Sequence, residues 1–399
     1  MTRTVATSRL PALDGLRGCA VLLVMGYHCG FLVLGVPTRI FRGGWIGVDI
    51  FFVLSGYLIT SGLLAGFERP QSITLRSFYR RRFWRLGPAL IVLLVVWIVL
   101  TQSGALQVLQ LGNPPRPAPQ SQAWAPVLGM LTLGYNWWLA KDEPSPAQMD
   151  HVWSLAIEEQ FYLVWPSIMR CVFRRVANPR RALMGICAAG VIMSLAISLW
   201  ASDTGRRDFA YFATITRMLG LFLGAVVAIE FGGRHAEPEA GGVVSTRSRQ
   251  AAAVALVGLL VLALTVPDDN RKLVPLASVL AALCAAMVIR RVVVDANART
   301  RWFGWSWLRW CGKRSYALYL WDWPATAVSS QFISDSRLVA LTSVVVAFGC
   351  ATLSWRFVES RFNGRGRVAP TATDARDQLL MRPMVGVEAA GGRLRGSAS

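Results

Sequence analysis

Long apolar stretches separated by short arginine-rich segments are the feature that most constrains this chain. A helix of about 20 apolar residues crosses the hydrocarbon core of a bilayer, and ten stretches of that kind can be drawn here. Only 16% of the residues are charged and 54% are hydrophobic, whereas soluble domains are about a quarter charged. The sequence therefore predicts an all-α, polytopic bundle of about 10 transmembrane helices. The predicted spans are 13–34, 45–66, 84–102, 152–170, 182–200, 210–231, 250–267, 273–290, 314–332 and 337–358.

The arginine-rich segments predict the orientation of the bundle, because Lys and Arg concentrate in cytoplasmic loops. With a cytoplasmic N-terminus, nearly all the arginine falls inside, including the cluster 76–85 and the tail from Arg361. We therefore expect a multi-pass protein of the inner (plasma) membrane with both termini cytoplasmic. A further apolar stretch, 124–140, would invert this pattern if it crossed the membrane, so we expect it to be re-entrant or peripheral.

The composition also predicts the domain organisation and some partners. Residues 1–362 form one transmembrane domain, and 363–399, rich in Gly, Ala and Arg, is expected to be a disordered cytoplasmic tail. The net charge of +20 lies in short clusters between apolar stretches, which favours membrane lipid or an anionic cofactor over nucleic acid as partner. The seven cysteines have no metal-ligand spacing, so no metal is expected.

Two ionisable residues lie within the first predicted span, Arg17 and His28. They are eleven residues apart, which places them on one helix face about 16 Å apart along the axis. Buried ionisable residues in membranes are costly and are functional candidates by default. The orientation puts Arg17 near the cytoplasm and His28 in the outer half of the bilayer.

Three more ionisable residues, Asp49, Glu158 and Arg217, are predicted at the depth of His28, roughly 6–11 Å below the outer interface. The alternative is a set of independent structural ion pairs, but such pairs have no reason to share a depth. We therefore expect one polar site that contains all four groups.

The fourth span adds a polar stripe, because Ser154, Glu158 and Tyr162 follow one another at intervals of four residues. This spacing points all three side chains to one side of a helix, either toward the polar site or as a plain packing face. His151, at the outer end of that span, is expected to be a surface or interfacial histidine.

A cytoplasmic cluster of arginines opens the third span, with aromatic residues interleaved. It anchors the chain to anionic lipid headgroups or binds a polyphosphate cofactor, since Arg pairs with phosphate in a bidentate manner. Arg82 and Arg85, three residues apart, are placed to hold one anion together, with Arg81 beside them.

Five blocks of sequence together resemble the membrane acyltransferase-3 family. The similarity covers about residues 9–362 in order. The blocks are Leu10-Pro-Ala-Leu-Asp-Gly-Leu-Arg17 with His28 (an Arg-x10-His signature), 45–59, 78–88 (an Arg-x-x-Arg motif at Arg82 and Arg85), 151–162 (a Trp-Ser-Leu…Glu-Glu-Gln-Phe-Tyr block) and 211–224. The chain departs from the family in the stretch 315–324, where Asp322 stands in place of a common second histidine.

The resemblance implies an integral membrane O-acyltransferase that moves an acyl group, expected to be acetyl, from cytoplasmic acyl-CoA to a hydroxyl of a cell-envelope carbohydrate or glycolipid. Arg81, Arg82 and Arg85 would then bind the CoA phosphates, and Arg17 would stabilise the cofactor or the thioester oxygen. His28 would act as general base or transient acyl carrier, oriented by Asp49 or Glu158. The remaining candidates for substrate binding are Ser154, Tyr162, Arg217 and Asp322.

Two other functions remain open at this point. One is acylation of a small secondary metabolite, such as a glycosylated or macrolide compound. The other is a proton-coupled transporter or lipid-linked glycan flippase that uses the buried charges as a proton relay. Against the transporter, the sequence has no inverted repeat.

Overall fold

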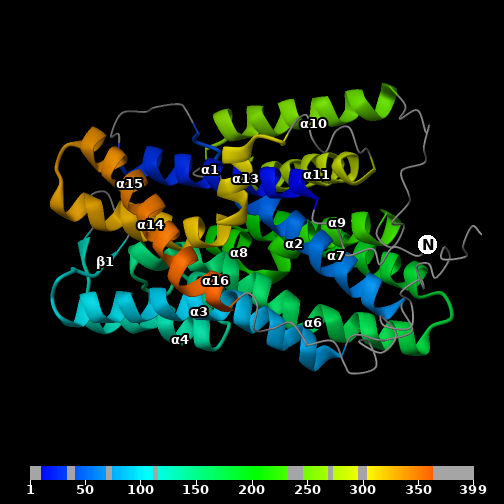
Figure 1. The fold of residues 1–399 in the computed structure, drawn as a ribbon, viewed down its shortest axis with the longest axis horizontal. Helices are drawn as coiled ribbons and strands as arrows, with labels where there is room; N and C mark the ends of the chain where they lie inside the picture. The colour runs from blue at the N-terminus through cyan, green and yellow to red at the C-terminus, as the bar shows by residue number, and fades with distance from the viewer. Residues whose placement is uncertain are drawn as a thin grey trace, which may run out of the picture.

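The structure, a computed structural model, describes residues 10–33, 41–68, 74–110, 116–231, 246–267, 273–294 and 303–362. The predicted tail, 363–399, lies outside the described residues. Within them the chain is a bundle of helices, and the long helices run roughly along the horizontal axis of Figure 1. The predicted all-α, polytopic membrane architecture is confirmed.

Each of the ten predicted spans corresponds to a long helix. These are α1 (Pro11–Val33), α2 (Ile46–Phe67), α3 (Leu75–Gln102), α6 (Trp153–Arg175), α7 (Pro179–Asp203), α9 (Thr214–Phe231), α10 (Thr246–Thr265), α11 (Leu273–Val294), α14 (Ser315–Phe332) and α15 (Ser336–Ser354). Among the described residues, seven helical segments are long and apolar enough to cross a membrane. The helices α1, α6 and α14 are not among those seven, and they carry His28, Glu158 and Asp322.

Shorter elements connect the long helices. They are β1 (Leu109–Gln110), β2 (Arg116–Pro117), η1 (Gln120–Trp124), α4 (Ala125–Leu131), α5 (Tyr135–Ala140), η2 (Ala147–Val152), α8 (Arg207–Phe212), α13 (Ser306–Lys313), the π-helical turn η3 (Trp355–Glu359) and α16 (Ser360–Phe362). The two strands pair antiparallel, with Leu109 opposite Pro117.

The apolar stretch 124–140 forms two short helices, α4 and α5, rather than one span. The chain breaks between them at Leu133, whose φ of 56° lies in the left-handed region. Helices of six and seven residues are about 10 Å long, too short to cross a bilayer. The prediction that this stretch does not form a separate crossing is therefore confirmed.

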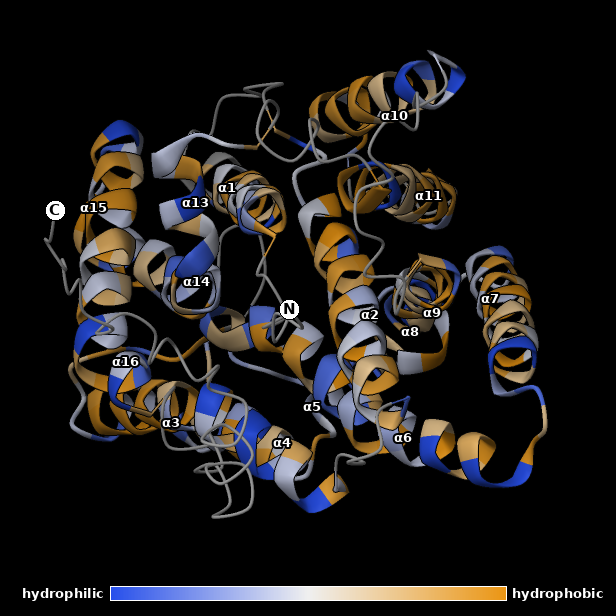
Figure 2. Cartoon of the chain, turned by 45° about the vertical axis from the view of Figure 1, so that its right-hand side comes forward, coloured by the Kyte–Doolittle hydropathy of each residue, from blue (hydrophilic) through white to orange (hydrophobic). Residues whose placement is uncertain are grey.

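Large apolar side chains lie exposed on several long helices, and Figure 2 colours much of α7, α10 and α15 orange, as hydrophobic. Exposed examples are Ile192 on α7, Val254 on α10 and Leu341 on α15. Such a surface would promote association in water, whereas lipid chains solvate it. These faces are therefore the lipid-facing side of the bundle.

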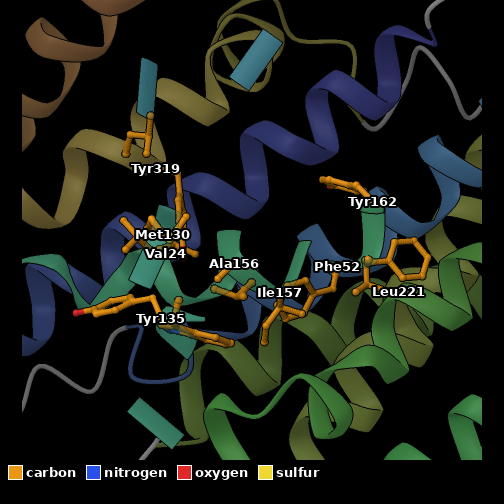
Figure 3. Packing of buried hydrophobic residues seen from close by; sticks show 14 of the residues in the cluster. Val24, Phe52, Met130, Tyr135, Ala156, Ile157, Tyr162, Leu221 and Tyr319 are labelled. Atoms are coloured by element: carbon orange, nitrogen blue, oxygen red, sulfur yellow. The ribbon is translucent and has the colours of Figure 1, made fainter. Parts of the chain in front are cut away.

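Buried side chains from α1, α2, α3, α6, α9 and α14 pack in the middle of the bundle, and Figure 3 shows part of this core around Phe52, Ile157 and Leu221. The close contact between α2 and α9 depends on two glycines. A methyl group on Gly56 would collide with the Leu221 carbonyl, and one on Gly224 with the Val53 carbonyl. Small residues of this kind let membrane helices approach closely.

The segment before α6 enters the bundle instead of staying at its outer end. Within η2, the Ala147 carbonyl accepts a hydrogen bond from the Trp323 indole, and the His151 ring lies 3.2 Å from the Leu320 carbonyl. Trp153 at the start of α6 packs against Phe52, already well inside α2. Because η2 docks on the middle of α14, α6 begins deep in the structure, and this positions the site.

Candidate functional site

His28 on α1 pairs with Asp322 on α14. The Nδ1 atom of His28 lies 2.6 Å from Oδ2 of Asp322, and the two residues are 8% and 1% exposed. The indole of Trp323 packs on the imidazole, with ring centroids 4.4 Å apart. In a neutral imidazole this geometry places the hydrogen on Nδ1, where it donates to the carboxylate, and leaves a lone pair on Nε2. The arrangement gives His28 a fixed orientation and a basic nitrogen.

The partner of His28 differs from the sequence prediction, which assigned its orientation to Asp49 or Glu158. Neither carboxylate pairs with His28 in the described part of the chain, since both have other partners. The partner of His28 is instead Asp322, which stands at the position where the family commonly has a histidine. A carboxylate at that position accepts the Nδ1 hydrogen and so orients the neighbouring imidazole. A second histidine could do the same only as a neutral ring that accepts this hydrogen bond.

Glu158 on α6 is the centre of a second polar group. Its carboxylate accepts hydrogen bonds from Ser55 on α2 at 2.8 Å and from the Tyr162 hydroxyl at 2.6 Å. The Arg82 guanidinium lies 3.9 Å from Glu158 and from Glu159, and its carbon is 3.4 Å from the centre of the Tyr162 ring. The stripe predicted on α6 therefore does face polar groups rather than apolar packing alone.

Arg17 lies beside this Glu158 cluster, and its charge interacts with those of Asp14, Glu158 and Arg82. The Arg17 Nε is buried and has no hydrogen-bond partner among the described residues. An unsatisfied buried donor of this kind costs about 1–3 kcal/mol, which a ligand oxygen would remove. Arg17 therefore offers a donor to an acceptor atom of a bound molecule.

A pocket with an empty volume of about 430 Å³ lies between α1, α2, α6 and α14. Its polar lining is Arg17, Ser55, Ser154, Glu158, Ser315, Tyr316 and Tyr319, and its apolar lining is Val48, Phe51, Phe52 and Leu155. The pocket suits an uncharged polar group with an apolar end.

The pocket and the His28–Asp322 pair are connected along α14. Tyr316 and Tyr319 line the pocket, and Asp322 follows three residues later, about one helical turn further along. The Tyr319 hydroxyl lies 2.5 Å from Ser154 Oγ and 2.8 Å from the His151 carbonyl oxygen. Tyr319 thus marks the end of the pocket nearer to His28.

Asp49 and Arg217 form a separate pair. Their closest atoms are 3.2 Å apart, both residues are buried, and Arg217 also donates to Ser278 on α11 at 2.6 Å. The rings of Phe52, Trp153 and Tyr211 surround the guanidinium. Neither residue lines the pocket. This environment is that of an ion pair that holds α2, α9 and α11 together.

The predicted single site of His28, Asp49, Glu158 and Arg217 is therefore wrong, since the structure divides these residues among three groups. The error has a physical cause. The sequence-based depths assumed that the outer end of each predicted span lies at the outer interface, but α6 begins inside the bundle, opposite Phe52 and Tyr319. Glu158 is consequently deeper than expected and meets Arg82, whose helix begins on the predicted cytoplasmic side.

The arginines of α3 lie in different surroundings. Arg82 points into the bundle and its side chain is 14% exposed, whereas Arg85 is exposed and interacts electrostatically with Glu359. The half-buried Arg81 is repelled by the neighbouring Arg80. Arg82 and Arg85 thus have different carboxylate neighbours in the described part of the chain. Arg81 and Arg85 remain at the surface.

His151 is buried, not interfacial as the sequence predicted. It is 4% exposed, and its Nε2 donates to the Leu320 carbonyl. Burial lowers its pKa to about 3, so the ring is neutral. Sequence analysis also missed Ser55, Tyr316 and Tyr319. For the two tyrosines a signal existed, because Tyr316, Tyr319 and Asp322 recur every three residues on α14.

Comparisons with known proteins identify the family of this chain. Residues 10–356 match the acyltransferase domain that defines the acyltransferase 3 family. The chain is 30% identical to the peptidoglycan O-acetyltransferase OatA of Listeria monocytogenes over 92% of its own length, and 30% identical to a putative peptidoglycan O-acetyltransferase, YrhL, of Bacillus subtilis over 90%. A putative O-acetyltransferase of Staphylococcus aureus is 31% identical over 90%. The chain spans 55–58% of the length of these relatives. No solved structure matches it.

Proposed function

Because the chain belongs to the acyltransferase 3 family, we propose that it moves an acetyl group from cytoplasmic acetyl-CoA to a hydroxyl of a cell-envelope carbohydrate or glycolipid. Membership of the family makes the chain a membrane acyltransferase that transfers groups other than amino-acyl groups. The names of two relatives identify peptidoglycan as a substrate of those proteins. A cell-envelope glycan is the acceptor that we infer for this chain.

The observation that carries the proposal is the His28–Asp322 pair, one helical turn beyond the pocket. Asp322 holds Nδ1–H of His28, so Nε2 is available to take the proton of an acceptor hydroxyl. The hydroxyl oxygen then attacks the thioester carbon, the carbon–sulfur bond breaks, and the CoA thiolate leaves and takes up the proton. In a two-step version, Nε2 of His28 first accepts the acetyl group and then passes it to the hydroxyl.

On the donor side, Arg17 and the arginines of α3 provide the binding groups. Arg81 and Arg85 lie at the surface and suit the CoA phosphates. Arg82, stacked on Tyr162 beside Glu158, connects this surface to the pocket. The unpartnered Nε of Arg17 would donate to an oxygen of the bound cofactor at the inner end of the pocket.

We also infer the location of the protein. It is a multi-pass membrane protein, and the arginine distribution supports a plasma-membrane location with both termini in the cytoplasm. The arginine cluster of α3 then faces the acetyl-CoA pool, and membrane lipid surrounds the bundle. Cysteine labelling from each side of the membrane, at residue 3 and at residue 390, tests this orientation.

The alternatives predict other products. Acylation of a small secondary metabolite would leave envelope glycans unchanged in a deletion strain and yield the des-acyl metabolite. A proton-coupled transporter or flippase would not consume acetyl-CoA. Mass spectrometry of envelope glycans and glycolipids, with and without the gene, tests the proposal. We expect a mass difference of one acetyl group, and unchanged glycans would contradict the proposed acceptor.

A further inference from the structure

His151 has one nitrogen committed to the protein and one without a partner. Its Nε2 lies 3.2 Å from the Leu320 carbonyl, and a carbonyl only accepts, so Nε2 carries the hydrogen. The neutral ring then has a lone pair on Nδ1, which is buried and without a hydrogen-bond partner among the described residues. A buried acceptor left unsatisfied is costly, and its presence in a folded protein calls for an explanation.

The position of His151 supplies that explanation. Its ring packs against Tyr319, with centroids 5.6 Å apart, and its carbonyl accepts from the Tyr319 hydroxyl. Tyr319 and Ser154 line the pocket. On the same segment of α14, Asp322 and Trp323 hold the ring of His28, and the two imidazoles interact electrostatically. His151 therefore contacts a residue that lines the pocket and packs on the same segment of α14 that holds His28.

We propose that Nδ1 of His151 accepts a hydrogen bond from a second hydroxyl or amide N–H of the acceptor, adjacent to the hydroxyl that His28 deprotonates. The substrate class is then a polyol such as a sugar, which presents neighbouring donors, and not a simple alcohol. This inference rests on the proposed function, because it assigns His28 to the acceptor hydroxyl.

The protonation state of His151 separates its role from that of His28. Burial lowers the pKa of His151 to about 3, so the ring stays neutral near pH 7 and is too weak a base to take a proton from a hydroxyl efficiently. A neutral ring is, however, a good hydrogen-bond acceptor. The carboxylate partner of His28 instead holds that ring with Nε2 available for proton transfer. The two imidazoles are thus complementary, one for proton transfer and one for positioning.

Two substitutions separate the two nitrogens of His151. The shorter amide of His151→Asn places its oxygen near the position of Nδ1, which keeps an acceptor for the substrate and loses the bond to Leu320. The longer amide of His151→Gln places its NH₂ near the position of Nε2, which keeps the bond to Leu320 and loses the acceptor. Each variant is therefore the control for the other, and both keep a neutral polar side chain.

The experiment uses the full chain in its parent strain after deletion of the gene. Alkali-labile acetate on isolated cell-envelope glycans is measured for wild type and both variants, at membrane levels matched by immunoblot. We expect His151→Gln to lower the acetate about tenfold to a hundredfold, the size of one unsatisfied buried hydrogen bond, and His151→Asn to retain most of it. Acetyl-CoA binding to the purified variants in nanodiscs should match wild type.

The opposite order, with His151→Gln active and His151→Asn impaired, would mean that only the bond to Leu320 matters and would overturn the inference. Equal acetate in both variants would overturn it as well, since an ordered water on Nδ1 would give that result. If wild type and the deletion strain carry the same acetate, the proposed function itself fails, and the inference fails with it.

Discussion

Two buried acid–base pairs in the described part of the bundle, Asp49–Arg217 and His28–Asp322, differ in what they can do. Asp49–Arg217 joins two groups at 3.2 Å that are surrounded by aromatic rings and bonded to Ser278. His28–Asp322 joins two groups at 2.6 Å, one helical turn from a pocket. Arginine cannot give up its proton in a protein, whereas histidine exchanges one near neutral pH. Burial and pairing therefore do not identify a reactive centre, but a titratable partner beside a pocket does.

The largest effect should come from breaking the structural pair. Arg217→Gln leaves Asp49 buried without its cation, and we expect it to lower the free energy of unfolding by about 3–5 kcal/mol. Thermal melting of the purified protein in nanodiscs measures this loss. The double variant Asp49→Asn, Arg217→Gln should recover part of it, because no lone charge remains. A wild-type melting temperature for Arg217→Gln would remove the distinction between the pairs.

In the reactive pair, Asp322→Asn should affect catalysis and not stability. The amide still fits against Nδ1 of His28 but no longer stabilises the positive charge that the ring gains as a base. We expect acetyl transfer from acetyl-CoA to fall about a hundredfold, within the range for general acid–base groups. The free energy of unfolding should stay within about 1 kcal/mol of the wild-type value. A large drop in melting temperature with normal turnover would make this pair structural too.

The donor side offers a milder test. Arg82→Lys keeps the positive charge near Glu158 but removes the planar guanidinium that stacks on Tyr162. We expect the KM for acetyl-CoA to rise about tenfold, equivalent to about 1.4 kcal/mol, with little change in kcat. A fall in kcat at constant KM would instead place Arg82 at the reacting atoms.

A third acid, Asp150, lies before α6 and accepts hydrogen bonds from the neutral hydroxyls of Tyr135 and Ser145. Burial raises its pKa to about 6, so the native state favours the protonated carboxyl. This stabilising contribution is fully present below the unfolded pKa near 4 and is lost as the pH rises through 6. Asp150→Asn should therefore raise stability at pH 7.5 by about 1 kcal/mol, because this partly exposed carboxylate is screened. Melting between pH 4 and pH 8 measures the effect, and an unchanged pH profile would contradict it.

Much of the fold could be predicted from the sequence. The hydropathy pattern predicted the ten long helices, and the arginine pattern predicted correctly that 124–140 does not form a separate crossing. These signals are local, since a span is recognised by its own residues. The i, i+4 spacing also predicted correctly that Ser154, Glu158 and Tyr162 share a polar side of α6.

The pairing of side chains between helices could not be predicted. The sequence gives the depth of a residue only relative to the ends of its own span. In the structure η2 docks on α14, so that α6 begins deeper than its span predicts, and these contacts join segments far apart in the sequence. As a result the partner of His28, the burial of His151 and the division of Arg82 from Arg85 became visible only in the structure. From the sequence, Asp322 is a departure from the family and a substrate-binding candidate, whereas in the structure it supplies the carboxylate that orients His28.

The central claim is that His28 performs chemistry on an acceptor while the Arg82–Glu158 side holds the donor. The most direct measurement compares His28→Ala with wild type in reconstituted vesicles, scoring both binding of acetyl-CoA and transfer of labelled acetyl to envelope glycan. The account predicts normal acetyl-CoA binding and a loss of transfer of at least about a hundredfold. Full transfer by His28→Ala would contradict it.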